Sequence, residues 1–191
     1  MDGFDSWEDF WDGDWKLYFE VQLPSPRSYR QWLAANIEAE NLVPYILDAA
    51  RNRNGIGFRA DLEGPTHVDA LMLNSHTGCG VMFEAKVLSD ASCSITFDPC
   101  RNQLARNIDC MLETNNTLPE PLRSRQPDRT LFVLLTPVLF RNQPTTRLYG
   151  WLMNEYCRRP ESIGQHLPHR TGIDWNAVSA RLGWMTWECM S

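Results

Sequence analysis

The sequence predicts an α/β protein with a mixed central sheet flanked by helices. Two short apolar runs, at residues 67–73 and 81–87, and a continuous apolar run at 131–135 are typical of strands, whereas the segments around them repeat apolar residues at helical spacing. A chain of 191 residues is close to the usual size of a single core. We therefore expect one domain over residues 25–191, preceded by an acidic, aromatic N-terminal segment at 1–24.

The elements before the first apolar run are predicted from capping residues, prolines and alternation. Ser25 and Pro26 form a good helix start, with serine as the N-cap and proline at the first helical position. Apolar residues then recur at helical spacing, at Tyr29, Trp32, Leu33 and Ile37. Pro44 should end this helix or open a second short one. Residues 55–62 alternate as a strand does, so we expect the first strand there, although two glycines weaken it.

The first two apolar runs should form an antiparallel hairpin, because residues 74–80 between them are rich in turn formers. Side chains alternate along a strand, which places Glu84 and Lys86 on one face, roughly 6.6 Å apart. If the hairpin pairs in register, Asp69 lies beside Glu84. The hairpin therefore predicts a cluster of two carboxylates and one ammonium group.

This cluster has the chemistry of a phosphodiester-cleaving metal site. Two carboxylates on adjacent strands offer the hard oxygen ligands that Mg²⁺ prefers. The chain has sixteen arginines and only two lysines, Lys16 and Lys86, so a lysine at this place is unlikely to be incidental. The compact ammonium of Lys86 would face the same phosphate and neutralise charge that develops in the transition state.

The elements after the hairpin follow the same rules. Asp98 and Pro99 repeat the N-cap and proline signature, and a buried helical stripe follows at Leu104, Ile108, Met111 and Leu112. Gln103, Arg106 and Asn107 fall on the polar flank of that stripe. The run at 131–135 should be a strand buried on both faces. Two further helices are expected near residues 147–158 and 174–183.

The Asp-x14-Glu-x-Lys pattern, in its hairpin and with helices on both sides, resembles the PD-(D/E)XK nucleases over about residues 28–140. The resemblance implies a restriction-endonuclease-like core, with a mixed sheet in the order αβββαβ, and extra C-terminal helices in this chain. Val68 stands where the family commonly has a proline. The implied activity is hydrolysis of DNA by a Mg²⁺- or Mn²⁺-dependent endonuclease, in restriction, repair or antiviral defence.

The resemblance also implies roles for individual residues. Asp69, Glu84 and Lys86 match the catalytic motif, and the metal ligands would be Asp69, Glu84 and the backbone carbonyl of Ala85. Glu38 occupies the place of a glutamate that family members often add from the first helix. Gln103 fits the glutamine of the branch related to RecB exonuclease. Nucleic-acid contacts are expected from the polar residues of this helix region, Arg101, Gln103, Arg106 and Asn107.

The net charge of −6 runs against a simple DNA-binding surface, because most DNA-binding proteins are basic. The excess is local, since residues 1–20 hold seven acidic residues and Lys16, and the rest of the chain is neutral. The arginines of the domain would then either build a local positive rim or make ordinary surface ion pairs. The acidic, tryptophan-rich start is open to three interpretations: partner docking, an autoinhibitory flap, or packing of its aromatic residues on the domain.

Two alternatives to a DNase remain at this point. One is a non-catalytic scaffold that binds a protein through its tryptophan-rich surface, and the other is an RNase with the same site. A protein partner or a homodimer is left open, whereas a small organic cofactor and a membrane partner are not expected. The six cysteines form no Cys-x-x-Cys pair and no apolar run approaches about eighteen residues, so we expect reduced thiols and a cytoplasmic protein.

Overall fold

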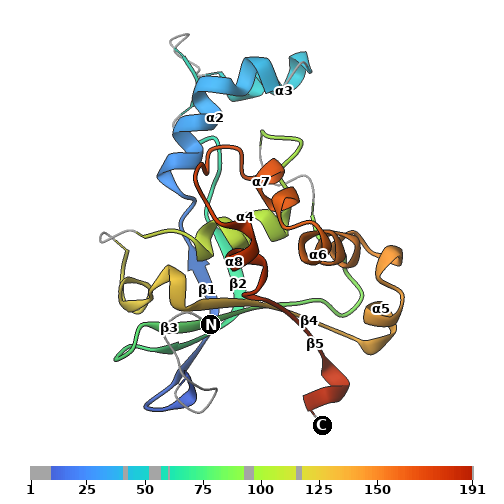
Figure 1. The fold of residues 1–191 in the computed structure, drawn as a ribbon. Coiled ribbons are helices and arrows are strands. Elements are labelled where there is room, and N and C mark those ends of the chain that lie inside the picture. Colours follow the sequence, from blue (N-terminus) through green and yellow to red (C-terminus); the bar gives the residue numbers. More distant parts are fainter. Residues whose placement is uncertain are drawn as a thin grey trace.

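The computed structural model describes residues 10–40, 43–51, 57–59, 61–92, 97–114 and 118–190. Over these residues the chain is an α/β protein with a five-stranded mixed sheet and seven α-helices, which confirms the predicted class. Figure 1 shows α4, α6 and α8 on one side of the sheet, while α2 and α3 project away from it.

The sheet follows the order of the chain. Its strands are β1 (Lys16–Leu23), β2 (Thr66–Asn74), β3 (Cys79–Ala85), β4 (Thr130–Thr136) and β5 (Leu182–Thr186). The pairs β1–β2 and β2–β3 are antiparallel, whereas β3–β4 and β4–β5 are parallel. The predicted hairpin is therefore confirmed, and so is the buried strand at 131–135.

The helices vary in length from five to fourteen residues. They are α2 (Arg27–Glu40), α3 (Pro44–Ala50), α4 (Gln103–Met111), α5 (Val138–Asn142), α6 (Leu148–Arg158), α7 (Glu161–His166) and α8 (Trp175–Ser179). In the part of the chain that the structure describes, none of them has the length and apolar character needed to cross a bilayer.

The main core lies between the sheet and the helices that cover it. Leu71 of β2 is paired with Met82 of β3, and both are completely buried with Leu104 and Ile108 of α4. This is the apolar stripe that the sequence predicted for α4. Docking of this stripe on the hairpin brings the polar flank of α4 over the end of β3.

The opposite face of the sheet is covered by aromatic residues from the start of the described chain. Phe10 is buried against Val81 and Val133, with Trp15 packed beside them. The packing interpretation of the aromatic start therefore holds for Phe10 and Trp15, while residues 1–9 lie outside the described part. Phe19, in the edge strand β1, is 72% exposed.

The first strand is not where the sequence predicted it. Of the expected strand at 55–62, the described residues form only an isolated bridge between Phe58 and Arg51, and Gly57 has a φ of 73°, which a strand does not accommodate. The first strand is instead β1, which lies within the acidic, aromatic segment at 1–24 and pairs with β2. One strand therefore precedes the first helix, so the element order differs from αβββαβ.

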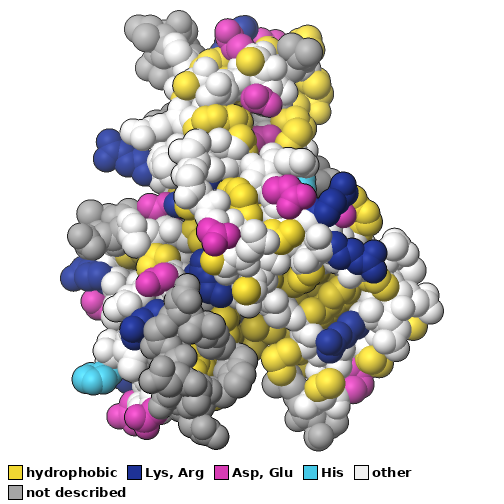
Figure 2. Space-filling view, in the orientation of Figure 1, with side chains coloured by type: hydrophobic (Ala, Val, Ile, Leu, Met, Phe, Trp, Pro, Cys, Tyr) yellow, Lys and Arg dark blue, Asp and Glu magenta, His cyan; other side chains and the backbone are white. Residues whose placement is uncertain are grey.

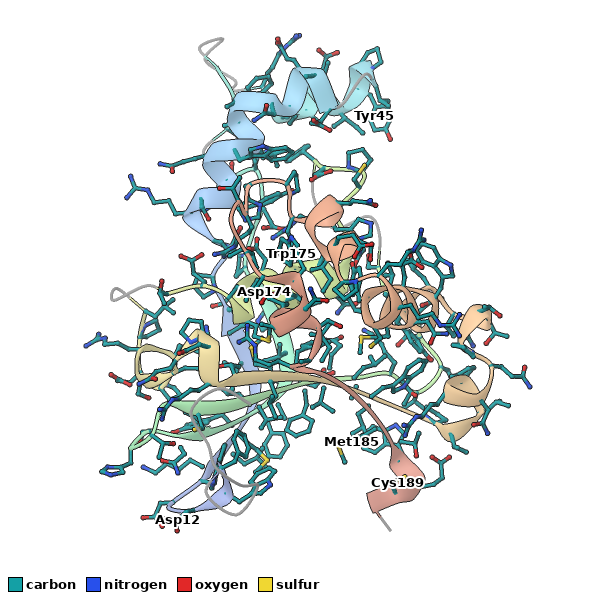
Figure 3. The ribbon with its side chains drawn as sticks, in the orientation of Figure 1. Asp12, Tyr45, Asp174, Trp175, Met185 and Cys189 are labelled. Carbon is teal, nitrogen blue, oxygen red and sulfur yellow. The ribbon has the colours of Figure 1, made fainter. Side chains whose placement is uncertain are left out.

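Two helix boundaries also differ from the prediction. The helix expected from Asp98 starts at Gln103, because Asn102 is its N-cap and accepts a hydrogen bond from the backbone N–H of Ala105 at 2.9 Å. The Asp98 side chain instead accepts a hydrogen bond from the N–H of Cys100, closing a local turn. The last helix was predicted at 174–183, but α8 has only five residues. Asp174, labelled in Figure 3, is its N-cap, and the strand β5 follows.

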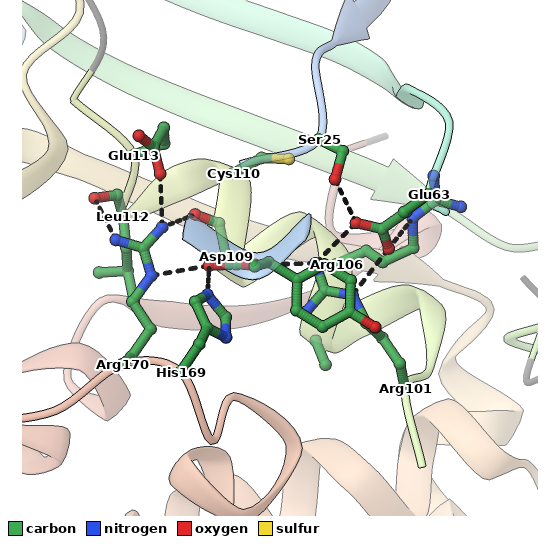
Figure 4. Close-up of polar contacts among 12 residues, drawn as sticks. Ser25, Glu63, Arg101, Arg106, Asp109, Cys110, Leu112, Glu113, His169 and Arg170 are labelled. Atoms are coloured by element: carbon green, nitrogen blue, oxygen red, sulfur yellow. Dashed lines mark hydrogen bonds and ion pairs between the residues drawn. The ribbon is translucent and has the colours of Figure 1, made fainter. Parts of the chain in front are cut away.

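A buried ionic network fixes α4 to the segments around it (Figure 4). The Arg101 guanidinium contacts Glu63 at 2.7 Å and Asp109 at 2.8 Å, and all three side chains are at most 1% exposed. Asp109 also lies 3.0 Å from His169 and 2.7 Å from Arg170. The network therefore joins the loop before β2, α4 and the segment before α8.

These partners control the charge of Asp109. Burial alone would raise the pKa of its carboxyl group, but the hydrogen bond from His169 and the charges of Arg101 and Arg170 outweigh it and lower the pKa to about 2. The ordinary value is 3.8, so the ionised carboxylate contributes on the order of 2 kcal/mol of stability above that pH. This contribution is lost as the pH falls through about 2.

Asp109→Asn should lower the free energy of unfolding by roughly 3–5 kcal/mol at pH 7, because it leaves buried cations without their anion. The difference from the parent protein should shrink as the pH falls from about 4 to about 2. Urea denaturation at several pH values measures both effects. Asp61→Asn is the matched control, since the Arg59–Asp61 pair is exposed and its loss should change stability little. Equal effects of the two substitutions would contradict this account.

Candidate functional site

The hairpin brings Asp69 and Glu84 together. Ala70 is paired with Phe83, so the next position of the same register sets Asp69 opposite Glu84. The carboxylate of Asp69 accepts a hydrogen bond from the backbone N–H of Ala85 at 2.5 Å. Asp69 is half-buried, so its side chain borders solvent beside the end of β3.

Three donors converge on the Glu84 carboxylate, which is only 2% exposed. The Lys86 ammonium lies 2.8 Å from Oε1, and the Gln103 side-chain amide donates to the same oxygen at 2.7 Å. The Asn107 amide donates to Oε2 at 2.8 Å. Gln103 and Asn107 are four residues apart on α4 and so lie on one face of that helix.

Opposing effects act on the pKa of the Glu84 carboxyl group. Burial raises the pKa of the Glu84 carboxyl group, and the nearby charge of Asp69 raises it further. Lys86 and Asn107 act in the opposite direction, but the pKa remains above its ordinary value. A carboxylate of this kind is a candidate functional group, because raised pKa values with specific charge partners gather at active sites.

Lys86 is held by the chain on both sides. Its backbone N–H donates to the carbonyl of Leu135 at 2.9 Å, which extends the pairing with β4 beyond Ala85. The loop that follows is fixed by Asp90, whose carboxylate accepts hydrogen bonds from the backbone N–H groups of Leu148 and Tyr149 at the start of α6. Only 11% of the Lys86 side chain is exposed, and it points to Glu84.

The backbone beside Asp69 is strained. Phe19 is paired with Ala70 and Val21 with Val68, so Glu20 of β1 stands opposite Asp69 in the register. Glu20 has a φ of 50°, in the left-handed region that non-glycine residues seldom adopt. Such strain tends to occur at functional sites, and it distinguishes this part of the sheet.

The structure does not bring Glu38 to this cluster. Glu38 lies in the last turn of α2, the end that projects away from the sheet in Figure 1, and its side chain is 66% exposed. Its carboxylate is 3.6 Å from the Arg51 guanidinium. Tyr45 of α3 marks the same projecting end in Figure 3. The axis of α2 therefore carries the predicted fourth ligand away from Asp69 and Glu84.

Two of the predicted nucleic-acid residues have internal partners. The Arg101 side chain is fully buried in the ionic network. Arg106 is 3.0 Å from Glu63 and donates to the carbonyls of Gly64 and Pro65. Basic and acidic side chains are interspersed on the face seen in Figure 2. The guanidinium groups of both arginines bind groups of the protein itself. A DNA contact by these arginines stays a prediction.

Sequence reasoning missed the groups behind the Glu84 cluster. Thr66 donates its hydroxyl hydrogen to the Asn107 side-chain oxygen at 3.3 Å, and Ser92 donates its backbone N–H to the Gln103 side-chain oxygen at 3.4 Å. Both contacts join residues far apart in the chain. A threonine at a strand start and a serine in a loop carry no local pattern that would have revealed them.

The donor set fits a divalent metal ion. Asp69 and Glu84 supply two carboxylates, and Mg²⁺ is commonly bound by one or two carboxylates with waters and phosphate oxygens in its other positions. The third ligand predicted from the sequence is the backbone carbonyl of Ala85, the residue that follows Glu84. Across the described residues, no three or more His, Cys, Asp or Glu side chains gather in an arrangement that could hold a metal ion. With two carboxylates and no third, the described residues would fit only an ion that takes its remaining ligands from water or phosphate, as Mg²⁺ commonly does.

Comparisons with models of protein families, with curated proteins and with solved structures find no match to this chain.

The carboxyl carbon of Glu84 should titrate above the ordinary pKa of 4.5 in the parent protein, since burial disfavours the charged form. Lys86→Met removes a group that lowers this pKa, so the midpoint should rise further. Carbon-detected NMR of the glutamate side chains measures both midpoints. Lys16→Met, which removes the other lysine from the exposed strand β1, should leave the Glu84 midpoint unchanged. A midpoint that fails to rise in Lys86→Met would contradict the charge balance described above.

Proposed function

We propose that this protein is a Mg²⁺- or Mn²⁺-dependent endonuclease that hydrolyses DNA, with a core related to the restriction-endonuclease-like fold. The observation that carries the proposal is the contact of Lys86 with Glu84, beside Asp69, at the end of the hairpin. These are the three residues that the PD-(D/E)XK resemblance singled out. The hairpin β2–β3, the helix α4 after it and the strand β4 parallel to β3 support the same core, although β1 precedes α2 instead of following it.

The metal would be held by Asp69, Glu84 and the carbonyl of Ala85. When bound, it would polarise the phosphoryl oxygen and lower the pKa of a coordinated water. Asp69 keeps its position through the N–H of Ala85. Glu84 keeps its position through Gln103 and Asn107, so the protein fixes the two carboxylates before any ligand binds.

Lys86 is the residue with a direct role in the chemistry. Its ammonium is a compact point charge that pairs with Glu84, and it would face a phosphate that approaches Asp69 from solvent. A cation at this place neutralises negative charge on the phosphate as it develops in the transition state, and it orients the attacking water. Arginine would be a poorer substitute, because its fork is rigid and stays charged.

The proposal is tested by incubating supercoiled plasmid and single-stranded DNA with the protein and Mg²⁺, Mn²⁺ or EDTA. We expect cleavage that EDTA abolishes, and a loss of rate of about 100- to 1,000-fold in Lys86→Met, since it removes a transition-state charge. Glu84→Ala should abolish cleavage. Lys16→Met should retain the parent rate, because Lys16 lies at the exposed start of β1.

Circular dichroism and thermal denaturation show whether each variant is folded. Folded parent protein that cleaves neither DNA form with either metal would contradict the proposal. Cleavage of RNA but not of DNA would assign the same site to the RNase alternative.

A further inference from the structure

Two side-chain amides hold Glu84, and each has a second hydrogen-bond partner on its other side. An asparagine or glutamine amide offers an oxygen acceptor on one side and an NH₂ donor on the other, and the two sides have nearly the same shape. A carboxylate accepts hydrogen bonds only from the donor side. Glu84 is therefore held well only when both amides present nitrogen.

Thr66 holds the Asn107 amide from the side opposite Glu84. Its hydroxyl donates to Asn107 Oδ1 at 3.3 Å, while Asn107 Nδ2 donates to Glu84 Oε2 at 2.8 Å. Asn107 is completely buried and Thr66 is 6% exposed, so water does not replace this contact. If the amide turned over, its oxygen would face the Glu84 carboxylate, and two buried acceptors would oppose each other, which is costly. Glu84 therefore fixes which end of the amide faces it, because the Thr66 hydroxyl can either donate or accept. The part that Thr66 plays is to satisfy the buried oxygen of the amide and so hold the amide in place.

Gln103 has a weaker support of the same kind. The backbone N–H of Ser92 donates to its side-chain oxygen at 3.4 Å, and its nitrogen donates to Glu84 Oε1 at 2.7 Å. A backbone donor cannot be removed by substitution of the side chain. Thr66 is thus the one member of this outer layer whose contribution can be tested directly.

We propose that Thr66 is a positioning residue of the site, which acts through the Asn107 amide to hold the Glu84 carboxylate in its metal-binding orientation. The effect on metal binding rests on the proposed function, whereas the contact by which Thr66 holds the Asn107 amide does not. It also gives Asn107 a role that differs from the nucleic-acid contact predicted from the sequence. Outer partners of this kind commonly change metal affinity by about 10- to 100-fold when they are removed.

The test compares Thr66→Val with Thr66→Ser. Valine keeps the shape of threonine and removes the hydroxyl, whereas serine keeps the hydroxyl and restores the donor. Thr136→Val is the matched control, because Thr136 is also a buried strand threonine whose hydroxyl has partners, here Pro137 and Trp184. Thr66→Val, Thr66→Ser and Thr136→Val should all lose some stability, so a stability measurement alone does not show whether Thr66 positions Asn107.

The deciding readout is the Asn107 side-chain NH₂ signal in nitrogen-15 NMR spectra of metal-free protein, identified by its loss in Asn107→Ala. We expect Thr66→Val to shift this signal and speed its hydrogen exchange, with Thr66→Ser and Thr136→Val near the parent values. Titration with Mn²⁺ should then show affinity about 10- to 100-fold weaker in Thr66→Val only, with recovery in Thr66→Ser.

An Asn107 signal that Thr66→Val leaves unchanged would overturn the proposal, and so would the same shift in Thr136→Val. If the signal moves as expected and Mn²⁺ binds the parent and Thr66→Val equally, the link from Asn107 to the metal site is overturned. A parent protein that neither binds Mn²⁺ nor cleaves DNA would instead refute the proposed function, and the NMR signal would still decide whether Thr66 positions Asn107.

Discussion

The burial of the Glu84 carboxylate between β3 and α4 is the constraint on which the rest of the site depends. An ionised carboxylate taken out of water is costly unless it is paired and fully hydrogen-bonded. Here Lys86 and the two amides of α4 supply the donors. Because Gln103 and Asn107 reach the carboxylate only when α4 sits in one register over the hairpin, the polar contacts of Glu84 fix that register along with the apolar stripe beneath it.

The same helix is fixed again on another face by Asp109. Arg101 just before α4 and Asp109 near its end pair with each other, and through Glu63 and His169 they hold the loop before β2 and the segment before α8. The acidic and basic groups of this network are buried and internally paired, so they serve the fold. Asp69 and Lys86 beside Glu84 differ from this network, because both are half-buried, and under the proposed function their charges would face the metal ion and the phosphate.

The sequence predicted the elements with strong local signals and missed those set by distant partners. The hairpin was evident because two apolar runs flank turn formers, and its register follows from the alternation that places Asp69 opposite Glu84. The edge strand β1 was missed because its charged, aromatic neighbourhood reads as a separate segment, and β5 because it has only five residues. The sequence could not reveal that Arg101 binds Glu63, thirty-eight residues away, inside the protein. Glu38 was expected at the metal from its helix alone, whose direction only the packing of α2 determines.

The most direct measurement of the central claim is a calorimetric titration of the metal-free protein with Mn²⁺, carried out on the parent and on Asp69→Asn. Asn keeps the size of the side chain and its hydrogen-bond acceptor to Ala85, and removes one negative charge from the carboxylate pair. If Asp69 and Glu84 form a metal site, the parent binds Mn²⁺ and Asp69→Asn binds it at least 10-fold more weakly while remaining folded. Folded parent protein that shows no Mn²⁺ binding, or a variant that binds as tightly as the parent, would contradict the account.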